Sequence, residues 1–211
     1  MRVCVFSVIY SERFLNDFLY FWTKQFYTDF DFLFVNEGID ITPYPLDRCK
    51  QIFYKGTIAE NRMVGLDYAK EHYDYLIFAD SDDYCSATRI GKSVELLMKG
   101  FDIVANELFL MDEKGFSALE PTLSNIYDNN QIITKMPRMN IFGFGNTAVN
   151  LHKVKKEDYD FPVNDKILDK IFFKNMFKRH CKAVFTNDCQ TYYRQYEGQT
   201  MGWERLKKGE K

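Results

Sequence analysis

An apolar run that ends in three carboxylates is the feature that most constrains this chain. Residues 75–79, Tyr-Leu-Ile-Phe-Ala, are short and apolar enough for a buried strand, and Asp80-Ser81-Asp82-Asp83 follows directly. Like charges at one strand tip repel one another, so the folded chain needs a counter-cation there. A metal ion that also holds phosphate groups would satisfy the cluster.

The first half of the chain alternates strand and helix patterns. Thr57 to Glu60 has the form of a capping box, and Gly100 follows the third helical pattern. Such alternation is typical of an α/β fold with a mainly parallel sheet flanked by helices, and 211 residues suit a single domain. We expect strands at 2–9, 31–35, 51–54, 75–79 and 101–106, and helices that open at Ser11, Thr57 and Ser86.

Three polar segments follow strands of this expected sheet. They are residues 7–12, 36–38 and 80–83. Ligands bind beyond the carboxyl ends of the strands in such sheets. The sequence therefore predicts a binding site where these three segments meet.

The second half is less regular. Residues 107–130 have few periodic signals, and Phe142-Gly143-Phe144-Gly145-Asn146 predicts a loop or a close approach of backbone. A helix is expected from Asn164-Asp165 to about Lys178, followed by strands at 183–186 and 191–194.

Composition excludes several classes of partner and setting. A net charge of −2 implies no nucleic-acid partner. Five scattered cysteines with no C-x-x-C pair fit a reducing cytoplasm, and no apolar run approaches the ~20 residues of a membrane span. Arg2 leads directly into a strand pattern, so we expect no signal peptide. The basic segment 203–211 predicts a solvated tail, with weak peripheral contact at the inner face of the membrane as the alternative.

Several chemistries use closely spaced carboxylates. A calcium loop needs glycine at its sixth position, where this chain has Cys85. An aspartate-nucleophile phosphatase places its acidic pair on the first strand, whereas this cluster lies some eighty residues in. A polar turn before a helix capped at Ser86 accounts for one or two carboxylates, but not readily for three. The remaining interpretation is a divalent cation that clamps a nucleotide diphosphate.

These residues together resemble family 2 glycosyltransferases of the GT-A fold. The resemblance rests on the first strand and its Ser/Tyr/Glu loop, on residues 75–83 and on Tyr192-Tyr193-Arg194-Gln195. It also rests on the segment before the acidic motif, where the family pattern is matched by Ala59, Asn61, Arg62, Gly65 and Ala69. It covers residues 2–106 and is looser over 142–200.

The resemblance implies a nucleotide-sugar donor and a Mn²⁺ or Mg²⁺ ion. Asp82 would be the principal metal ligand with Asp83 in support, and Asp80 would lie near both the metal and the ribose. Glu37 would accept a hydrogen bond from uracil or guanine, so the donor would be a UDP- or GDP-sugar. The other residues that the resemblance assigns to the donor are Ser7, Tyr10, Glu12, Asn36 and Arg62.

The resemblance also implies an inverting transfer, which needs one general base near the acceptor hydroxyl. Asp165 is the expected base, with Asp169 in reserve. Because Lys166 and Lys170 are near in sequence, we expect Asp169 more readily to be a surface charge paired with one of them. Gly143 and Gly145 would let backbone approach the acceptor. Tyr193-Arg194-Gln195 would end the last strand, and Gly198-Gln199-Thr200 would lie near the diphosphate. Tyr196 stands where some relatives place a metal-binding histidine, so no histidine is assigned.

The expected enzyme is thus a glycosyltransferase of bacterial surface glycan or polysaccharide synthesis. Residues 1–106 would form the donor half and residues 107–202 the acceptor half, which would take a glycan or a lipid-linked acceptor. Three alternatives stay open: the phosphatase, a nucleotidyltransferase and a non-catalytic nucleotide- or glycan-binding module. The nucleotidyltransferase would need a Gly-rich basic loop after the first strand, and residues 7–12 contain neither Gly nor Lys. The sequence does not indicate an oligomeric state.

Overall fold

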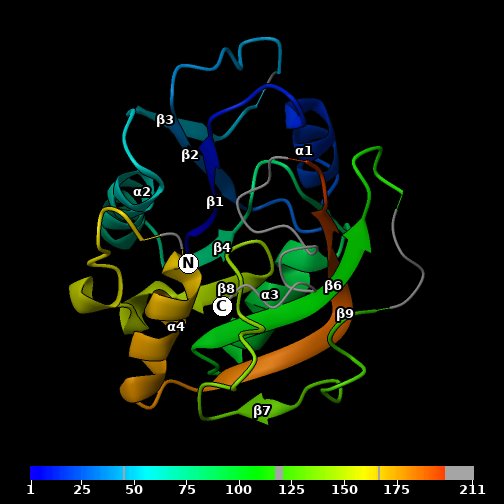
Figure 1. The fold of residues 1–211 in the computed structure, drawn as a ribbon, viewed down its shortest axis with the longest axis vertical. Coiled ribbons are helices and arrows are strands. Elements are labelled where there is room, and N and C mark those ends of the chain that lie inside the picture. Colours follow the sequence, from blue (N-terminus) through cyan, green and yellow to red (C-terminus); the bar gives the residue numbers. More distant parts are fainter. Residues whose placement is uncertain (45, 117–120, 166, 198–211) are drawn as a thin grey trace.

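The computed structural model describes residues 1–44, 46–116, 121–165 and 167–197. In this part of the chain one nine-stranded sheet runs in the order β3-β2-β1-β4-β8-β6-β9-β5, and β7 pairs with β9 (Figure 1). The elements are β1 (Val3–Ile9), α1 (Leu15–Trp22), β2 (Asp31–Asn36), β3 (Cys49–Phe53), α2 (Ile58–His72), β4 (Tyr75–Phe78), β5 (Tyr84–Cys85), α3 (Arg89–Met98), β6 (Ile103–Met111), β7 (Ile132–Ile133), β8 (Thr147–Asn150), the 3₁₀ turns η1 (Leu151–Lys153) and η2 (Lys156–Asp158), α4 (Leu168–Lys178) and β9 (Ala183–Arg194).

The α/β class is confirmed, with a sheet that is more mixed than expected. β3, β2, β1 and β4 are parallel, as the alternation of the first half predicts. β8 then lies antiparallel between β4 and β6, and β9 returns parallel to β6. A short antiparallel strand from the second half therefore joins the parallel half of the sheet to the β6–β9 pair.

Both faces of the sheet are covered, which explains the nearly continuous apolar runs in its strands. Along β1, Cys4 and Phe6 belong to one buried cluster, whereas Val3 and Val5 belong to the other. The first cluster includes side chains of α2 and α4, and the second includes side chains of α1 and α3. Figure 1 shows α2 and α4 together at the left of the molecule, with α1 at the upper right.

The helix at Thr57 starts as expected. The Thr57 side chain accepts from the Glu60 backbone N–H (3.2 Å), and the Glu60 carboxylate accepts from the Thr57 N–H (2.8 Å), so the predicted capping box is formed. The helix ends at His72, also as expected. Gly100 follows the end of α3 with φ +95°, a conformation that suits glycine.

Two predicted serine caps are wrong. Ser11 Oγ accepts from the nearby Arg13 N–H (3.1 Å), and α1 begins only at Leu15. Ser86 Oγ accepts from the N–H of Gln190 in β9 (3.0 Å), and α3 begins at Arg89. In both places the hydroxyl bonds another backbone amide, and the helix starts later without a side-chain cap.

The helix expected from Asn164-Asp165 also starts later, at Leu168. Asp165 Oδ1 accepts from the Ile167 N–H (2.9 Å), so it supports the turn before the helix. The two strands expected near the end of the chain are one strand, β9, interrupted by a bulge. Asn106 pairs with Thr186 and Glu107 with Gln190, so residues 187–189 lie outside the ladder.

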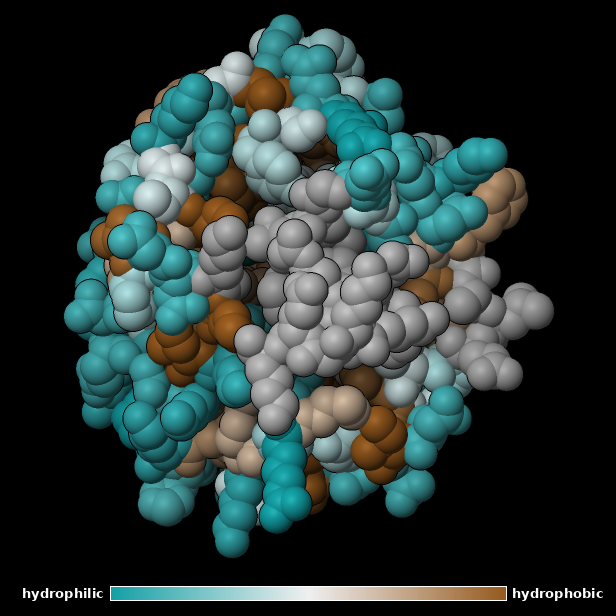
Figure 2. Space-filling model, viewed as in Figure 1, coloured by the Kyte–Doolittle hydropathy of each residue, from teal (hydrophilic) through white to brown (hydrophobic). Residues whose placement is uncertain are grey.

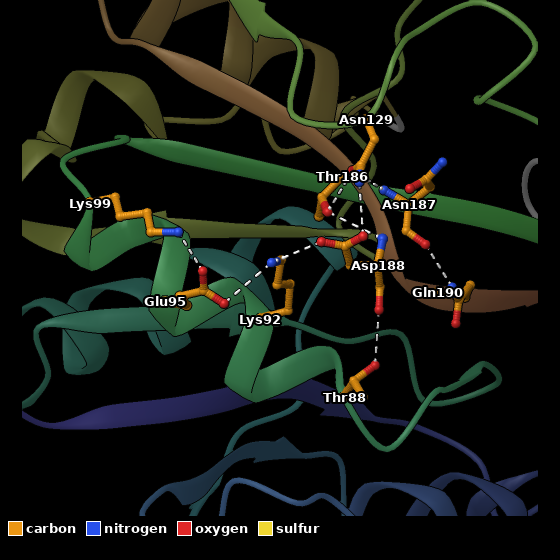
Figure 3. A network of polar contacts seen from close by, with 9 residues as sticks. All are labelled: Thr88, Lys92, Glu95, Lys99, Asn129, Thr186, Asn187, Asp188 and Gln190. Carbon is orange, nitrogen blue, oxygen red and sulfur yellow. Dashed lines mark hydrogen bonds and ion pairs between the residues drawn. The ribbon is translucent and has the colours of Figure 1, made fainter.

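A polar network holds this bulge against α3 and the segment that contains Asn129 (Figure 3). Asn129 Oδ1 accepts from the Thr186 hydroxyl and from the Asn187 N–H, both at 3.1 Å. Asp188 pairs with Lys92 of α3 (2.8 Å). These charges are satisfied by one another, so the network is a structural feature of the strand and not a candidate site.

The surface carries dispersed apolar residues. On the face shown in Figure 2, the hydrophobic residues form separate patches among hydrophilic ones. Within the described residues, no helix combines the length and apolar character needed to cross a bilayer. All five cysteines are free thiols, as expected.

The packing of α2 on β1 yields a stability prediction. A Cβ on Gly65 would overlap the ring of Phe6, which is fully buried. We expect Gly65→Ala to lower the free energy of unfolding by about 1–3 kcal/mol, because the core cannot absorb the methyl group without strain. Urea denaturation of both proteins measures the difference.

Gly91→Ala is the matched control, since Gly91 also lies within a helix but its Cβ would come no closer than 3.4 Å to Tyr27. This change should be neutral or stabilising by up to about 1 kcal/mol. Equal effects of the two substitutions would contradict the close contact between α2 and β1.

Candidate functional site

The acidic cluster lies at the edge of the sheet where parallel strands end. Asp80 follows β4, and Asp82 and Asp83 precede the two-residue strand β5, which pairs with β9. The Ala79 N–H bonds to the carbonyl of Phe6, so the cluster begins beside β1. Tyr10 and Ser11, which follow β1, line one cavity with Ser81 and Asp82, so two of the three expected segments, 7–12 and 80–83, meet there.

Arg62 of α2 forms an ion pair with Asp80 Oδ1. It is buried, and its guanidinium lies 5.5 Å from the Phe6 ring centre and 5.0 Å from that of Phe144. Its Nη1 is buried without a hydrogen-bond partner among the described residues. Arg62 thus faces the cluster with donor capacity left for a bound anion or carbonyl group.

Asp82 and Asp83 are both buried. Burial raises the pKa of Asp82 to about 6, and the negative charge of the neighbouring Asp80 is the second cause. Burial and the adjacent charge of Asp82 raise the pKa of Asp83 well above its ordinary value. Asp83 Oδ1 accepts from the Arg194 N–H (2.8 Å), whereas Oδ2 has no partner in the described part of the chain. An oxygen of this kind suits a cation.

Two further arginines stand behind the cluster. Arg194, at the end of β9, donates from Nε to the Asp82 carbonyl (2.9 Å) and from Nη2 to Asp17 (2.8 Å). Arg89 is fully buried and donates to the carbonyl of Phe78 (2.7 Å). Its positive charge acts against the rise in the pKa of Asp83. Neither arginine was assigned a charge-balancing role from the sequence.

The glycine-containing loop closes on the cluster from the second half of the chain. A Cβ on Gly145 would lie 3.0 Å from Asp80 Oδ2 and equally close to Asp83 Oδ2. Asn146 fixes this loop by donating to the carbonyls of Asn106 and Ile141, both at 3.0 Å. We predicted that Gly145 would approach the acceptor; the structure places it against the carboxylates.

The cluster fits a divalent cation by its chemistry. Across the described ranges, no three His, Cys, Asp or Glu side chains are arranged as a finished metal centre. However, Asp83 Oδ2 has no hydrogen-bond partner among the described residues, and the pKa of Asp82 is raised. The negative charge of these carboxylates is therefore not fully balanced by nearby positive charges and hydrogen-bond donors. Asp80, Asp82 and Asp83 are the residues that would hold the ion.

The turn after β2 brings Glu37 to α2. Glu37 accepts from Asn61 Nδ2 (2.5 Å), and Asn61 Oδ1 is buried without a partner among the described residues. Asn36 is buried beneath the turn, where its Oδ1 accepts from the N–H groups of Gly38 and Ile39. The Asn36 side chain therefore shapes the turn, while the half-buried Glu37 is held by the buried Asn61.

A cavity of about 280 Å³ opens beside Asp82. Tyr196 donates from its hydroxyl to Asp82 Oδ2 (3.0 Å), and Arg13 lies 4.8 Å from the Tyr196 ring centre. The lining residues are Tyr10, Ser11, Arg13, Phe14, Ser81, Asp82, Tyr196 and Glu197. Tyr10 and Asp82 were expected at the site from the sequence, whereas Arg13 was not, because a lone arginine at a helix start carries no motif.

Two other predicted donor residues lie apart from this cavity. Ser7 is fully buried within β1, and its hydroxyl has no partner among the described residues. Glu12 is exposed, and its backbone carbonyl accepts from the Leu15 N–H (3.2 Å). Their assignment to the donor stays a prediction.

The two candidate bases differ in environment. Asp165 supports the turn before α4, whereas Asp169 lies in the first turn of α4. Asp169 is half-buried and accepts from Asn140 Nδ2 (3.1 Å), so the expectation of a surface charge is wrong. Burial, with a further contribution from Asp80, raises the pKa of Asp169 to about 6. Asp169 therefore shares the electrostatic field of the cluster.

β9 ends at Arg194, as predicted for Tyr193-Arg194-Gln195. Burial raises the pKa of the Tyr193 hydroxyl, and the negative charges of Asp83, Asp80 and Asp82 raise it further. Gly198-Gln199-Thr200 and the basic tail 203–211 lie outside the described residues. Their predicted roles stay predictions.

No protein-family model and no curated protein matches the chain. Solved structures match it in fold. TarS from S. aureus aligns with a TM-score of 0.72 at 18% identity, over 93% of this chain and 37% of that one. TarS 1–349 in complex with UDP-GlcNAc aligns with a TM-score of 0.71 at 17% identity, over 94% and 60%. GalNAc-T7 with UDP, GalNAc and Mn²⁺ gives 0.67 at 10% identity, over 94% and 45%.

These matched structures are glycosyltransferases of the GT-A type, so the predicted fold is confirmed. The chain spans 37–60% of the length of the solved chains named above. Identities this low show a shared fold and not a shared activity.

The raised pKa of Asp82 predicts how metal-free stability depends on pH. The folded pKa of about 6 lies above the ordinary value, so stability falls as pH rises toward and through 6. Asp82→Asn cannot ionise, and we expect it to stabilise the protein at pH 7.5 by about 1–2 kcal/mol. The gain should shrink at pH 5, and urea denaturation in EDTA at the two pH values measures it.

Asp160→Asn is the control, because Asp160 is exposed. It should change stability by less than about 0.5 kcal/mol at either pH. A destabilised Asp82→Asn protein at pH 7.5 would contradict an uncompensated charge at this position.

Proposed function

We propose that this chain is an inverting family 2 glycosyltransferase that moves a sugar from a nucleotide diphosphate to an acceptor hydroxyl, with a divalent metal ion. The observation that carries the proposal is the Asp80–Asp83 cluster, with Asp82 and Asp83 buried and Arg62 paired with Asp80, at the carboxyl edge of the sheet in a GT-A fold. The ligands named for the matched structures, UDP-GlcNAc in one and UDP with Mn²⁺ in another, support this choice of donor and metal.

The donor half, residues 1–106, would bind the nucleotide through polar groups that converge on Asp80. Arg62 Nη1 and Asn61 Oδ1 are buried without partners among the described residues, so each can bond a ligand at little desolvation cost. Glu37, fixed by Asn61, would accept from a base N–H of a UDP- or GDP-sugar. Tyr10 of the cavity beside Asp82 would contact the ribose.

Asp80, Asp82 and Asp83 would hold Mn²⁺ or Mg²⁺, which supplies positive charge to the departing diphosphate. Arg13 lies in the wall of the adjoining cavity, where its guanidinium can meet phosphate oxygens. Tyr196 holds Asp82 Oδ2 from the other side. The cavity thus combines a cation site with donors for an anion.

Asp169 is the better candidate base. Its pKa of about 6 leaves it ionised at neutral pH yet more basic than an ordinary carboxylate. Asn140 and the Lys170 N–H orient its two oxygens. Asp169 would take the acceptor proton as the hydroxyl oxygen displaces the diphosphate from the sugar. Asp165, the base expected from the sequence, is engaged with the Ile167 N–H.

The acceptor half would be residues 107–202, with a glycan or lipid-linked acceptor in surface polysaccharide synthesis. Five free thiols support a cytoplasmic setting, with the acceptor met at the inner face of the membrane. We propose these as the enzyme's setting on the strength of the family resemblance.

Ligand binding tests the donor site directly. We expect UDP or GDP, or the corresponding nucleotide-sugar, to raise the melting temperature by several degrees with Mn²⁺ and by less without it, because binding only the folded state stabilises it. Asp82→Asn should lose the additional rise in melting temperature that Mn²⁺ gives, and Asp160→Asn should keep it. No shift with any nucleotide in a UDP, GDP, ADP, CDP and TDP panel would overturn the proposal.

Hydrolysis of the stabilising nucleotide-sugar separates the two candidate bases without a known acceptor. Asp169→Asn should lower the rate about 10²-fold or more while it keeps the nucleotide-induced thermal shift. The wild-type rate should rise with pH and level off above about 6, since Asp169 acts when deprotonated.

Asp165→Asn is the matched comparison. It should change hydrolysis only a few-fold and cost about 1 kcal/mol or less of stability through the turn before α4. The reverse pattern, with Asp165→Asn inactive and Asp169→Asn active, would restore Asp165 as the base.

A further inference from the structure

A second concavity lies along α1, with lining residues that differ from those of the cavity beside Asp82. Its volume is about 540 Å³, within the roughly 300–1,000 Å³ of ordinary small-molecule sites. It is lined by Asn16, Asp17, Leu19, Tyr20, Thr23, Tyr44 and Leu46. None of these residues lines the first cavity, so the two are separate sites on the surface.

The chemistry of this groove is amphipathic. Leu19 is buried and Leu46 half-buried, which gives an apolar base. Tyr20 is 59% exposed and Tyr44 is half-buried, and both line the groove. The Tyr44 hydroxyl donates to Asn16 Oδ1, so the phenol and the amide are held together across the groove.

The polar groups of the groove select among ligand classes. Asn16, Thr23 and the two phenols offer neutral hydrogen-bonding groups, and Asp17 is the charged member of the lining. Of the described residues that line it, none is Lys or Arg. Two cations contact the lining, Lys24 at 5.7 Å from the Tyr20 ring centre and Arg194 paired with Asp17. Since Arg194 is neutralised by Asp17, the lining favours a neutral ligand over an anion. Tyrosine rings and small apolar side chains suit the C–H faces of a sugar, while amides and carboxylates suit its hydroxyls.

We propose that this groove binds a neutral saccharide. The choice of a saccharide rests on the proposed function in one respect only: a chain that transfers sugars onto a growing glycan would meet such saccharides as acceptor or product. The groove itself is defined by its lining and volume, independently of the reaction.

Asp17 connects the groove to the acidic cluster. Its carboxylate accepts from Arg194 Nη2 (2.8 Å) and is half exposed on the groove side. The same Arg194 holds Asp83 through its backbone N–H and the Asp82 carbonyl through Nε. A saccharide hydroxyl bonded to Asp17 would therefore contact the direct partner of Arg194, the arginine that bonds Asp82 and Asp83.

Saturation-transfer NMR on the full chain, with neutral tri- and tetrasaccharides of glucose, galactose, mannose and N-acetylglucosamine as probes, tests the groove. We expect at least one probe to bind, and Tyr20→Ala to weaken it about 10-fold or more, since an aromatic contact is lost. Asn16→Ala should weaken the same probe. Phe26→Ala, at another exposed aromatic residue near α1, should leave binding unchanged.

Thermal melting of each variant confirms that it folds; if Tyr20→Ala does not, Tyr44→Phe, which removes one hydroxyl, takes its place. No binding of any probe to the wild type, or an equal loss in Phe26→Ala, would overturn the groove proposal. The nucleotide titration is a separate measurement on the other cavity. Saccharide binding without nucleotide binding would reject the proposed function and keep the groove, and the converse would reject the groove alone.

Discussion

The clustering of three carboxylates at one strand end, two of them buried, is the constraint on which this structure depends. Asp82 and Asp83 are buried. Asp80 raises the cost of ionising both, and Asp82 raises it further for Asp83. Three buried arginines oppose this charge, and they come from different parts of the chain: Arg62 from α2, Arg89 at the start of α3 and Arg194 from the end of β9. The two halves of the chain are thereby joined around one electrostatic centre.

Burying an arginine has its own desolvation cost, and the abundant aromatic residues offset part of it. Arg62 lies over Phe144 at 5.0 Å, Arg89 over Trp22 at 4.9 Å and Arg194 over Phe14 at 4.3 Å. Each guanidinium therefore has an aromatic ring beside it and donates at least one hydrogen bond. The aromatic residues thus stabilise the three buried arginines in addition to filling the core.

The sequence predicted the local features and missed those that depend on distant partners. The Asp80–Asp83 cluster, Arg62 and the Thr57 capping box are each readable from a few neighbouring residues. The cap at Ser86 failed because that hydroxyl bonds a strand over a hundred residues away, whereas Ser11 bonds the amide of Arg13, so its cap failed through a local alternative. Arg89 and Arg194 could not be assigned to the cluster, because only the pairing of β5 with β9 and the packing of α3 bring them there.

The choice between Asp165 and Asp169 shows the same limit at the level of one helical turn. A helix that starts at Asn164 would make Asp165 part of its first turn; the observed start at Leu168 gives that place to Asp169. The delay follows from the turn in which the Asp165 N–H bonds Pro162 and its carboxylate bonds Ile167. Because the position of a helix start decides which carboxylate turns inward, motif spacing alone pointed to the segment of the proposed base, and the local backbone favours one residue within it.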